Sequence, residues 1–187
     1  PVDLLSRLIQ FDTTNPPGDE AACVDWIAEQ LGDYGIDSVT YEKEAGRPNL
    51  LARLPGGDAP GLLLYGHVDV VPTEGQAWSH PPFEGVVEDG YVWGRGALDM
   101  KGGVTMMLAS FLRAAAEDVD LAGDLTLCIL ADEEGGGDAG ARYLVEEHPE
   151  VFEDVDYAIG EFGGVAAEIA GERFYPIQQN EKQVCWL

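Results

Sequence analysis

Several ionisable side chains stand directly after apolar stretches of the sequence, where they could share a site. They comprise one histidine and six carboxylates, with no cysteine among them. In chain order they are His67 and Asp69 after LLLYG, Asp99 within GRGALDMKGG, Asp132, Glu133 and Glu134 after LTLCILA, and Glu161 at the end of YAIGE. A histidine with several carboxylates suits hard or borderline divalent metals, so Zn²⁺, Co²⁺ and Mn²⁺ are the candidate ions.

The first pair, His67 and Asp69, is separated by one residue in the segment HVD. In an extended chain, residues i and i+2 project to the same face, so Asp69 is placed to hold the imidazole of His67. A carboxylate bound to a ligating histidine fixes its tautomer and raises its basicity. A histidine standing alone is more often a hydrogen-bonded core residue, but here the nearby carboxylates favour a metal ligand.

Asp99 lies in a glycine-rich bend, GRGALDMKGG, whose glycines allow backbone conformations that other residues avoid. A short carboxylate on such a bend can bridge two ions. The alternative is a helix N-cap, because a helix is predicted to begin near Lys101. A phosphate-binding loop is excluded, since the segment does not have the GxxxxGK[ST] order.

Glu133 and Glu134 are adjacent and cannot easily point the same way in an extended chain. This favours a division of roles, in which one binds metal and the other handles the proton of a metal-bound water. The alternative is a solvated acidic turn over residues 132–138, which is a serious competitor in so acidic a protein. The position after a buried strand favours the site.

Alternating helical and strand patterns surround these residues. Apolar periodicity predicts two helices within residues 1–35 and further helices over 101–118 and from 141 to 148. Strands are predicted at 36–42, 48–54, 61–67, 124–132, 155–161 and 173–178, with a hairpin at 86–93. Such an order indicates a three-layer α/β/α sandwich with a mostly parallel central sheet. Ligands then gather where the strands end, which is where the polar clusters stand.

The composition narrows the possible partners. Thirty-five acidic residues against ten basic ones give a net charge of −25, so nucleic acid and anionic membranes would be repelled. A diffuse acidic surface suits high salt, which leads to the hypothesis of a halophilic source; an acidic mesophilic protein is the alternative. Three dispersed cysteines without a CxxC pair favour a reducing cytoplasm, and no apolar run is long enough for a membrane span.

Three segments together resemble one family closely. They are GHVDVVP at 66–72, GRGALDMKGG at 94–103 and ADEEGGGDAGA at 131–141, supported by WSHPPFEGVVEDGYVWGRGA at 78–97. They are similar to the signatures of the zinc-dependent aminoacylase and carboxypeptidase family, which includes acetylornithine deacetylase, succinyl-diaminopimelate desuccinylase and carboxypeptidases of the G and S types. The segment EEGGGDAGA looks nearer to the carboxypeptidase S and aminoacylase branches than to the desuccinylases.

The resemblance implies a role for each candidate residue. His67 and Glu161 would bind one zinc, Glu134 the other, and Asp99 would bridge the two, with Asp156 a rival to Glu161. Glu133 would be the general acid/base, and Asp69 the carboxylate behind His67. A cis peptide is implied between Asp99 and Met100. The family completes the second zinc with a histidine close to its C-terminus. The remaining histidines here, His80 and His148, do not fit that position and are predicted to be structural or surface residues.

The resemblance also implies that residues 1–187 are the N-terminal portion of a catalytic domain, because EKQVCWL ends the chain as an apolar strand begins. A lid and dimerisation domain would start there and place a further histidine near the substrate. This portion alone would bind metal weakly and be inactive, and the whole protein would be a homodimer. The expected function is metal-dependent hydrolysis of an amide in a short peptide or N-acyl amino acid. A biosynthetic deacylase and a non-catalytic binding or scaffold protein are the alternatives.

Overall fold

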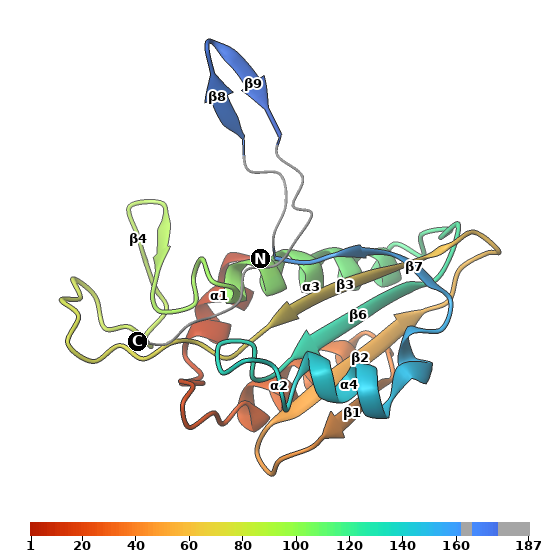
Figure 1. The fold of residues 1–187 in the computed structure, drawn as a ribbon, viewed down its shortest axis with the longest axis horizontal. Coiled ribbons are helices and arrows are strands. Elements are labelled where there is room, and N and C mark those ends of the chain that lie inside the picture. Colours follow the sequence, from red (N-terminus) through yellow and green to blue (C-terminus); the bar gives the residue numbers. More distant parts are fainter. Residues whose placement is uncertain (162–165, 176–187) are drawn as a thin grey trace.

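A computed structural model describes residues 1–161 and 166–175. Its central sheet contains β1 (Ser38–Glu42), β2 (Pro48–Leu54), β3 (Gly61–His67), β6 (Leu125–Leu130) and β7 (Val155–Ile159), in the order β1-β2-β6-β3-β7 (Figure 1). Strands β3, β6 and β7 are mutually parallel, whereas β2 is antiparallel to both β6 and β1. Strand β1 therefore also points the same way as β6, and only β2 runs against the others. The predicted, mostly parallel sheet is confirmed.

Helices cover both faces of this sheet, which makes the predicted three layers (Figure 1). One face packs against α1 (Val2–Ile9), α2 (Ala21–Asp33) and α3 (Lys101–Ala116). The other face packs against α4 (Ala141–Glu147) and the 3₁₀ helix η1 (Pro149–Phe152). Helix α3 shows why the first layer forms: Val104, Leu108 and Phe111 recur at helical spacing and are fully buried.

Two small hairpins lie outside the sheet. Strands β4 (Val86–Glu88) and β5 (Tyr91–Trp93) form the predicted hairpin, which turns at Asp89 and Gly90 with positive φ at both, as a tight two-residue turn requires. Strands β8 (Ala167–Ile169) and β9 (Glu172–Phe174) form the second hairpin, which stands away from the sheet in Figure 1.

The predicted elements agree with the structure over most of the chain. The strands at 48–54 and 61–67 have the predicted bounds, and helix α3 ends two residues before Asp118. The strand predicted at 173–178 was too long, because β9 ends at Phe174, and residues 176–178 lie outside the described residues. So does EKQVCWL at 181–187, including Cys185. No helix in the described ranges is long and apolar enough to cross a membrane.

The parallel strands place the candidate residues at one edge of the sheet. His67, the last residue of β3, pairs with Leu130, the last residue of β6. Asp132, two residues after Leu130, therefore lies at the same edge of the sheet as His67. Leu64 pairs with Ile159 at the end of β7, which brings Glu161 to the same edge. Asp99 reaches this edge from the bend before α3, where the peptide between Asp99 and Met100 is cis, as expected.

Candidate metal centre

The imidazole of His67 is buried and held from one side. Its Nδ1 donates a hydrogen bond to the carbonyl oxygen of Asp69 at 2.9 Å and lies 3.3 Å from the carboxylate Oδ1 of the same residue. Because a carbonyl oxygen only accepts, Nδ1 carries a proton, so the neutral form of the ring has its lone pair at Nε2. Nε2 is itself buried and has no hydrogen-bond partner among the described residues.

Three carboxylates surround this Nε2 atom. The distances are 3.2 Å to Oδ1 of Asp99, 3.7 Å to Oε2 of Glu133 and 3.7 Å to Oε2 of Glu161. One ligand atom each from His67, Asp99 and Glu161 lie within 4.8 Å of one another. An unpartnered imidazole nitrogen facing carboxylate oxygens is the arrangement that a divalent cation satisfies, so these residues fit a metal.

Asp69 does more than the sequence predicted. Its Oδ1 accepts the backbone N–H of Glu133 and its Oδ2 accepts the backbone N–H of Glu134, each at 3.0 Å. The fully buried carboxylate thus joins the end of β3 to the turn after β6. The same group that orients His67 also fixes the backbone from which both glutamates project.

Charge crowding shifts several pKa values in the absence of a cation. Burial opposes the charged form of His67, but the hydrogen bond and charge of Asp69 outweigh it and raise the pKa of His67 to about 9. Burial and then the charge of Asp99 raise the pKa of Glu134 to about 7. Burial and the neighbouring Asp99 carboxylate likewise raise the pKa of Glu161 to about 7. A divalent cation among these carboxylates would reverse this repulsion.

Glu134 stands apart from the group formed by His67, Asp99 and Glu161. It is half-buried and close enough to Asp99 for that charge to act on it. Asp99 thus lies in one group with His67 and Glu161, and its charge, with those of Glu133 and Asp69, also contributes to the raised pKa of Glu134. The side chain of Asp99 is mostly exposed.

The structure argues against two alternative roles, that of Asp99 as a helix N-cap and that of Asp156 as a ligand beside His67. Asp99 does not cap α3, because Met100 occupies the N-cap position without a side-chain hydrogen bond. Asp156 lies at the start of β7, opposite the beginning of β3, and so at the far edge of the sheet from His67. In the segment for which a solvated acidic turn was the alternative, Asp132 is buried, whereas Glu133 and Asp138 are exposed.

The other two histidines lie away from this centre, as predicted. His80 packs on the ring of Trp93, with 4.7 Å between ring centroids, and approaches Glu88. His148 follows α4 and contacts the hydroxyl of Tyr143 at 2.9 Å. Both are therefore engaged in local packing.

Sequence reasoning missed the buried polar residues that support the centre. Asn15 lies in a segment interpreted only as a turn, yet its Nδ2 donates to Oδ2 of Asp69 at 2.8 Å. Lys101 is fully buried at the start of α3, and its Nζ donates to the carbonyl oxygen of Phe11 at 2.8 Å. Burial lowers the pKa of this lysine. The available signal was an asparagine before two prolines and a lysine in an apolar helix.

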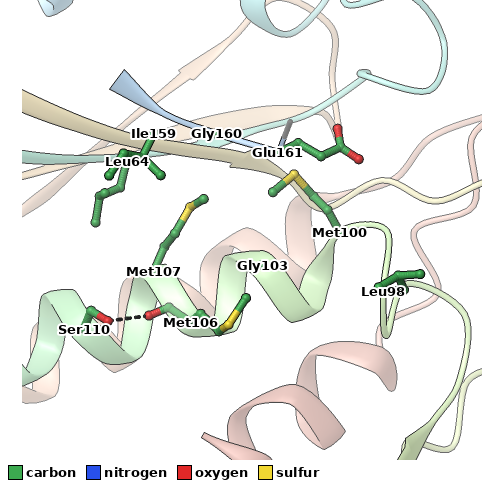
Figure 2. A pocket seen from close by; sticks show the side chains of 10 residues that line it. All are labelled: Leu64, Leu98, Met100, Gly103, Met106, Met107, Ser110, Ile159, Gly160 and Glu161. Atoms are coloured by element: carbon green, nitrogen blue, oxygen red, sulfur yellow. Dashed lines mark hydrogen bonds between the residues drawn. The ribbon is translucent and has the colours of Figure 1, made fainter. Parts of the chain in front are cut away.

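Two cavities flank the centre. One of about 410 Å³ lies between α3 and the end of β7, with apolar walls that include Leu98, Met100 and Met107 and with Glu161 at one end (Figure 2). The other, of about 400 Å³, lies beside the β4–β5 hairpin and extends from Trp78 to Asp99. The carboxylates thus have open space on two sides.

Comparison with known proteins places this geometry in a family. Residues 63–171 match the model of peptidase family M20/M25/M40, and this range contains all seven ionisable residues first considered as candidates. The chain belongs to peptidase family M20/M25/M40. Succinyl-diaminopimelate desuccinylase of Paracoccus denitrificans is 38% identical to this chain over 147 residues, which are 78% of this chain and 38% of that protein.

Solved structures show the same fold. Human carnosine dipeptidase 1 superimposes with a TM-score of 0.72 at 25% identity, covering 85% of this chain and 37% of that one. The Bacillus subtilis YXEP protein, described as a dinuclear metal-binding peptidase of the M20 family, has a TM-score of 0.61 at 18% identity, with coverages of 85% and 41%. This member of the M20/M25/M40 family thus spans about two fifths of the proteins it matches.

Proposed function

We propose that the whole protein is a metal-dependent hydrolase that cleaves an amide bond in a short peptide or an N-acyl amino acid. The observation that carries the proposal is the buried Nε2 of His67, which has no hydrogen-bond partner in the described ranges and faces the carboxylates of Asp99, Glu133 and Glu161. Membership of the M20/M25/M40 peptidase family supports the same activity.

Two ions would be held, with Zn²⁺ the first candidate and Co²⁺ or Mn²⁺ as substitutes. His67 and Glu161 would bind one, Glu134 would bind the other, and Asp99 would bridge them. The closeness of Asp99 to His67 and Glu161, and the effect of its charge on Glu134, support the assignment. When bound, such ions polarise the amide carbonyl and lower the pKa of a water molecule.

The remaining roles belong to side chains that are not ligands. Glu133 would accept a proton from the attacking water and deliver it to the leaving amine, a step that contributes roughly 10²- to 10⁴-fold in rate. Its carboxylate lies 3.7 Å from Nε2 of His67, near the ions but on a side chain exposed to incoming substrate. Asp69 would keep His67 in the Nδ1-protonated tautomer.

The class of substrate, a short peptide or an N-acyl amino acid, distinguishes two forms of the proposal. A second candidate is biosynthetic removal of an acyl group, which the 38% identity to a succinyl-diaminopimelate desuccinylase favours. A panel of dipeptides, N-acetyl amino acids and N-succinyl amino acids, each assayed with the full-length zinc-loaded protein, separates the two. Turnover of the succinylated substrates alone would establish the desuccinylase, and hydrolysis of none of them by a zinc-loaded protein would exclude both.

The domain organisation is also part of the proposal. Residues 1–187 would be the N-terminal portion of the catalytic domain, and the rest of the protein would supply a lid and dimer interface with the ligands that complete the second ion's site. The chain covers only 38% of the Paracoccus relative, which leaves room for such parts. Zinc-edge anomalous scattering from crystals of the full-length protein would locate both ions, and density at neither position would overturn the assignment.

The acidic surface supports the proposal that the protein comes from a halophilic organism and works in a cytoplasm of high salt concentration. At a net charge of −25 the folded chain repels itself, and molar salt screens that repulsion within about 3 Å. The midpoint of thermal unfolding should therefore rise steeply between dilute buffer and molar KCl. Equal stability in both solutions would exclude the halophilic origin.

A further inference from the structure

We infer that a buried ion-pair group formed by Glu20, Arg47 and Asp132, linked to Asp69 by Asn15, positions the backbone that carries Glu133 and Glu134. The inference rests on the proposed function, because it assigns positioning residues to that same site. None of Glu20, Arg47 and Asn15 contacts the metal-facing nitrogen of His67 among the described contacts. Their effect would pass through hydrogen bonds.

Asp132 has an unusual backbone conformation at the start of the turn that carries the two glutamates. It has a φ of 63°, a left-handed value that is unusual for a residue other than glycine, and it directly precedes the two glutamates. Its Oδ2 accepts the backbone N–H of Ala139 at 2.9 Å, and its carbonyl oxygen accepts that of Gly137 at 2.6 Å. Asp132, at the start of the turn of residues 132–139, is therefore hydrogen-bonded to the end of the same turn.

Arg47 connects this turn to Glu20 through its guanidinium group. Its Nη1 donates to Oδ1 of Asp132 at 2.9 Å, while its Nε and Nη2 donate to the two carboxylate oxygens of Glu20 at 3.1 and 2.8 Å. The planar guanidinium can serve two carboxylates at once, which a lysine ammonium cannot do with the same geometry. All three side chains are buried, and among the residues that the structure describes Arg47 is the cation that pairs with both carboxylates.

Asn15 connects the ion-pair group to the site. Nδ2 of Asn15 donates to Oδ1 of Asp132 at 3.1 Å and to Oδ2 of Asp69 at 2.8 Å. Asp69 in turn accepts the backbone N–H groups of Glu133 and Glu134. The two glutamates are thus held from both sides, by Asp132 before them and by Asp69 beneath them.

Close packing leaves this connection little freedom. A Cβ atom on Gly135 would lie 2.3 Å from Oδ1 of Asp132 and 2.8 Å from Nδ2 of Asn15. The turn therefore lies directly against the asparagine bridge, and a side chain at residue 135 would separate the groups. A shift of the turn would move both glutamate carboxylates relative to His67.

The test is the substitution Asp132→Asn in the full-length protein. Whichever way the new amide turns, its NH₂ group faces a donor, either the N–H of Ala139 or the donors of Arg47 and Asn15. Asp138→Asn is the matched control, because it makes the same change on the same turn at an exposed residue paired with Lys43.

The first measurement is hydrogen exchange in the metal-free protein, which needs no assumption about activity. Asp132→Asn should speed exchange of the amides of residues 133, 134 and 139 by about tenfold or more, whereas Asp138→Asn should leave them unchanged. Exchange at the wild-type rate in folded Asp132→Asn protein would overturn the inference. If the wild type proves to bind no metal, the proposed function fails while this result still decides the positioning.

The second measurement is kinetic and uses the zinc-loaded protein. Asp132→Asn should lower kcat by about 10- to 100-fold with KM little changed, since the affected groups handle metal and proton rather than substrate binding. A merely structural role would lower the melting midpoint without this split. Should Asp132→Asn fail to fold, Asn15→Ala decides, because it removes only the bridge; wild-type exchange and kcat in that variant would refute the positioning.

Discussion

The two sides of the candidate centre are built differently. One side, at the end of β3, is buried: the His67 side chain is 1% exposed and that of Asp69 is fully buried. On the other side the Asp99 side chain is 59% exposed, and the neighbouring Leu98 is 92% exposed. Apart from Nε2 of His67, the buried polar groups on the first side have hydrogen-bond partners that fix their positions, whereas the second side is open to ions and substrate.

This contrast predicts which substitutions should affect metal binding and turnover and which should affect folding stability. Substitutions on the exposed side should change metal binding and turnover with little effect on folding. Substitutions on the buried side should cost folding free energy first, because they leave charges without partners.

The largest effect is expected from Asp99→Ala. Because Asp99 would bridge both ions, its loss should empty both sites and abolish turnover, while the exposed position should leave the melting midpoint of the metal-free protein nearly unchanged. Metal content by mass spectrometry and thermal unfolding of the full-length protein check the two halves. Retention of two ions per chain would show that Asp99 is not the bridging ligand.

Glu133→Gln should have the next largest effect. The amide keeps the size of the side chain but cannot accept the proton, so kcat should fall by about 10²- to 10⁴-fold while both ions remain bound. The comparison with Glu134→Gln is the control, since that variant should lose one ion. A Glu133 variant that loses metal instead would make Glu133 a ligand and reverse the two roles.

On the buried side, Arg47→Met should destabilise the fold. The carboxylates of Glu20 and Asp132 would remain buried without their cation, which costs roughly 3–5 kcal/mol in the free energy of unfolding. Denaturant unfolding of the full-length protein measures this cost. The triple variant with Glu20→Gln and Asp132→Asn should recover part of it, and a cost below about 1 kcal/mol for Arg47→Met would mean that water reaches the pair.

The same division separates what the sequence predicts from what it does not. Strands such as 48–54 and 61–67 follow from apolar runs bounded by glycine and proline, and the ends of parallel strands place His67 and Glu161 at one edge. The partners of Arg47 could not be predicted, because Glu20 and Asp132 are distant in sequence and their pairing depends on tertiary packing. Local patterns carry no information about which buried charges meet.

The dual role of Asp69 was also beyond local reasoning. The spacing in HVD places its carboxylate beside His67, but its bonds to the amides of Glu133 and Glu134 cross 64 and 65 positions of the chain. Such contacts arise only once β3 and β6 lie side by side. The residues with chemical roles were therefore easier to find than those that hold them in place.

The smallest effect is expected at the outer side of the same turn, from Asp138→Asn. Its carboxylate lies 2.8 Å from Nζ of Lys43, and both side chains are exposed, so water and salt compensate for the lost pair. Thermal unfolding in dilute buffer and in molar KCl should give the wild-type midpoint within error in both. A clear loss of stability, or a lowered kcat, would show that the exposed end of the turn also holds the glutamates in place, and the division between buried and open sides would have to be redrawn.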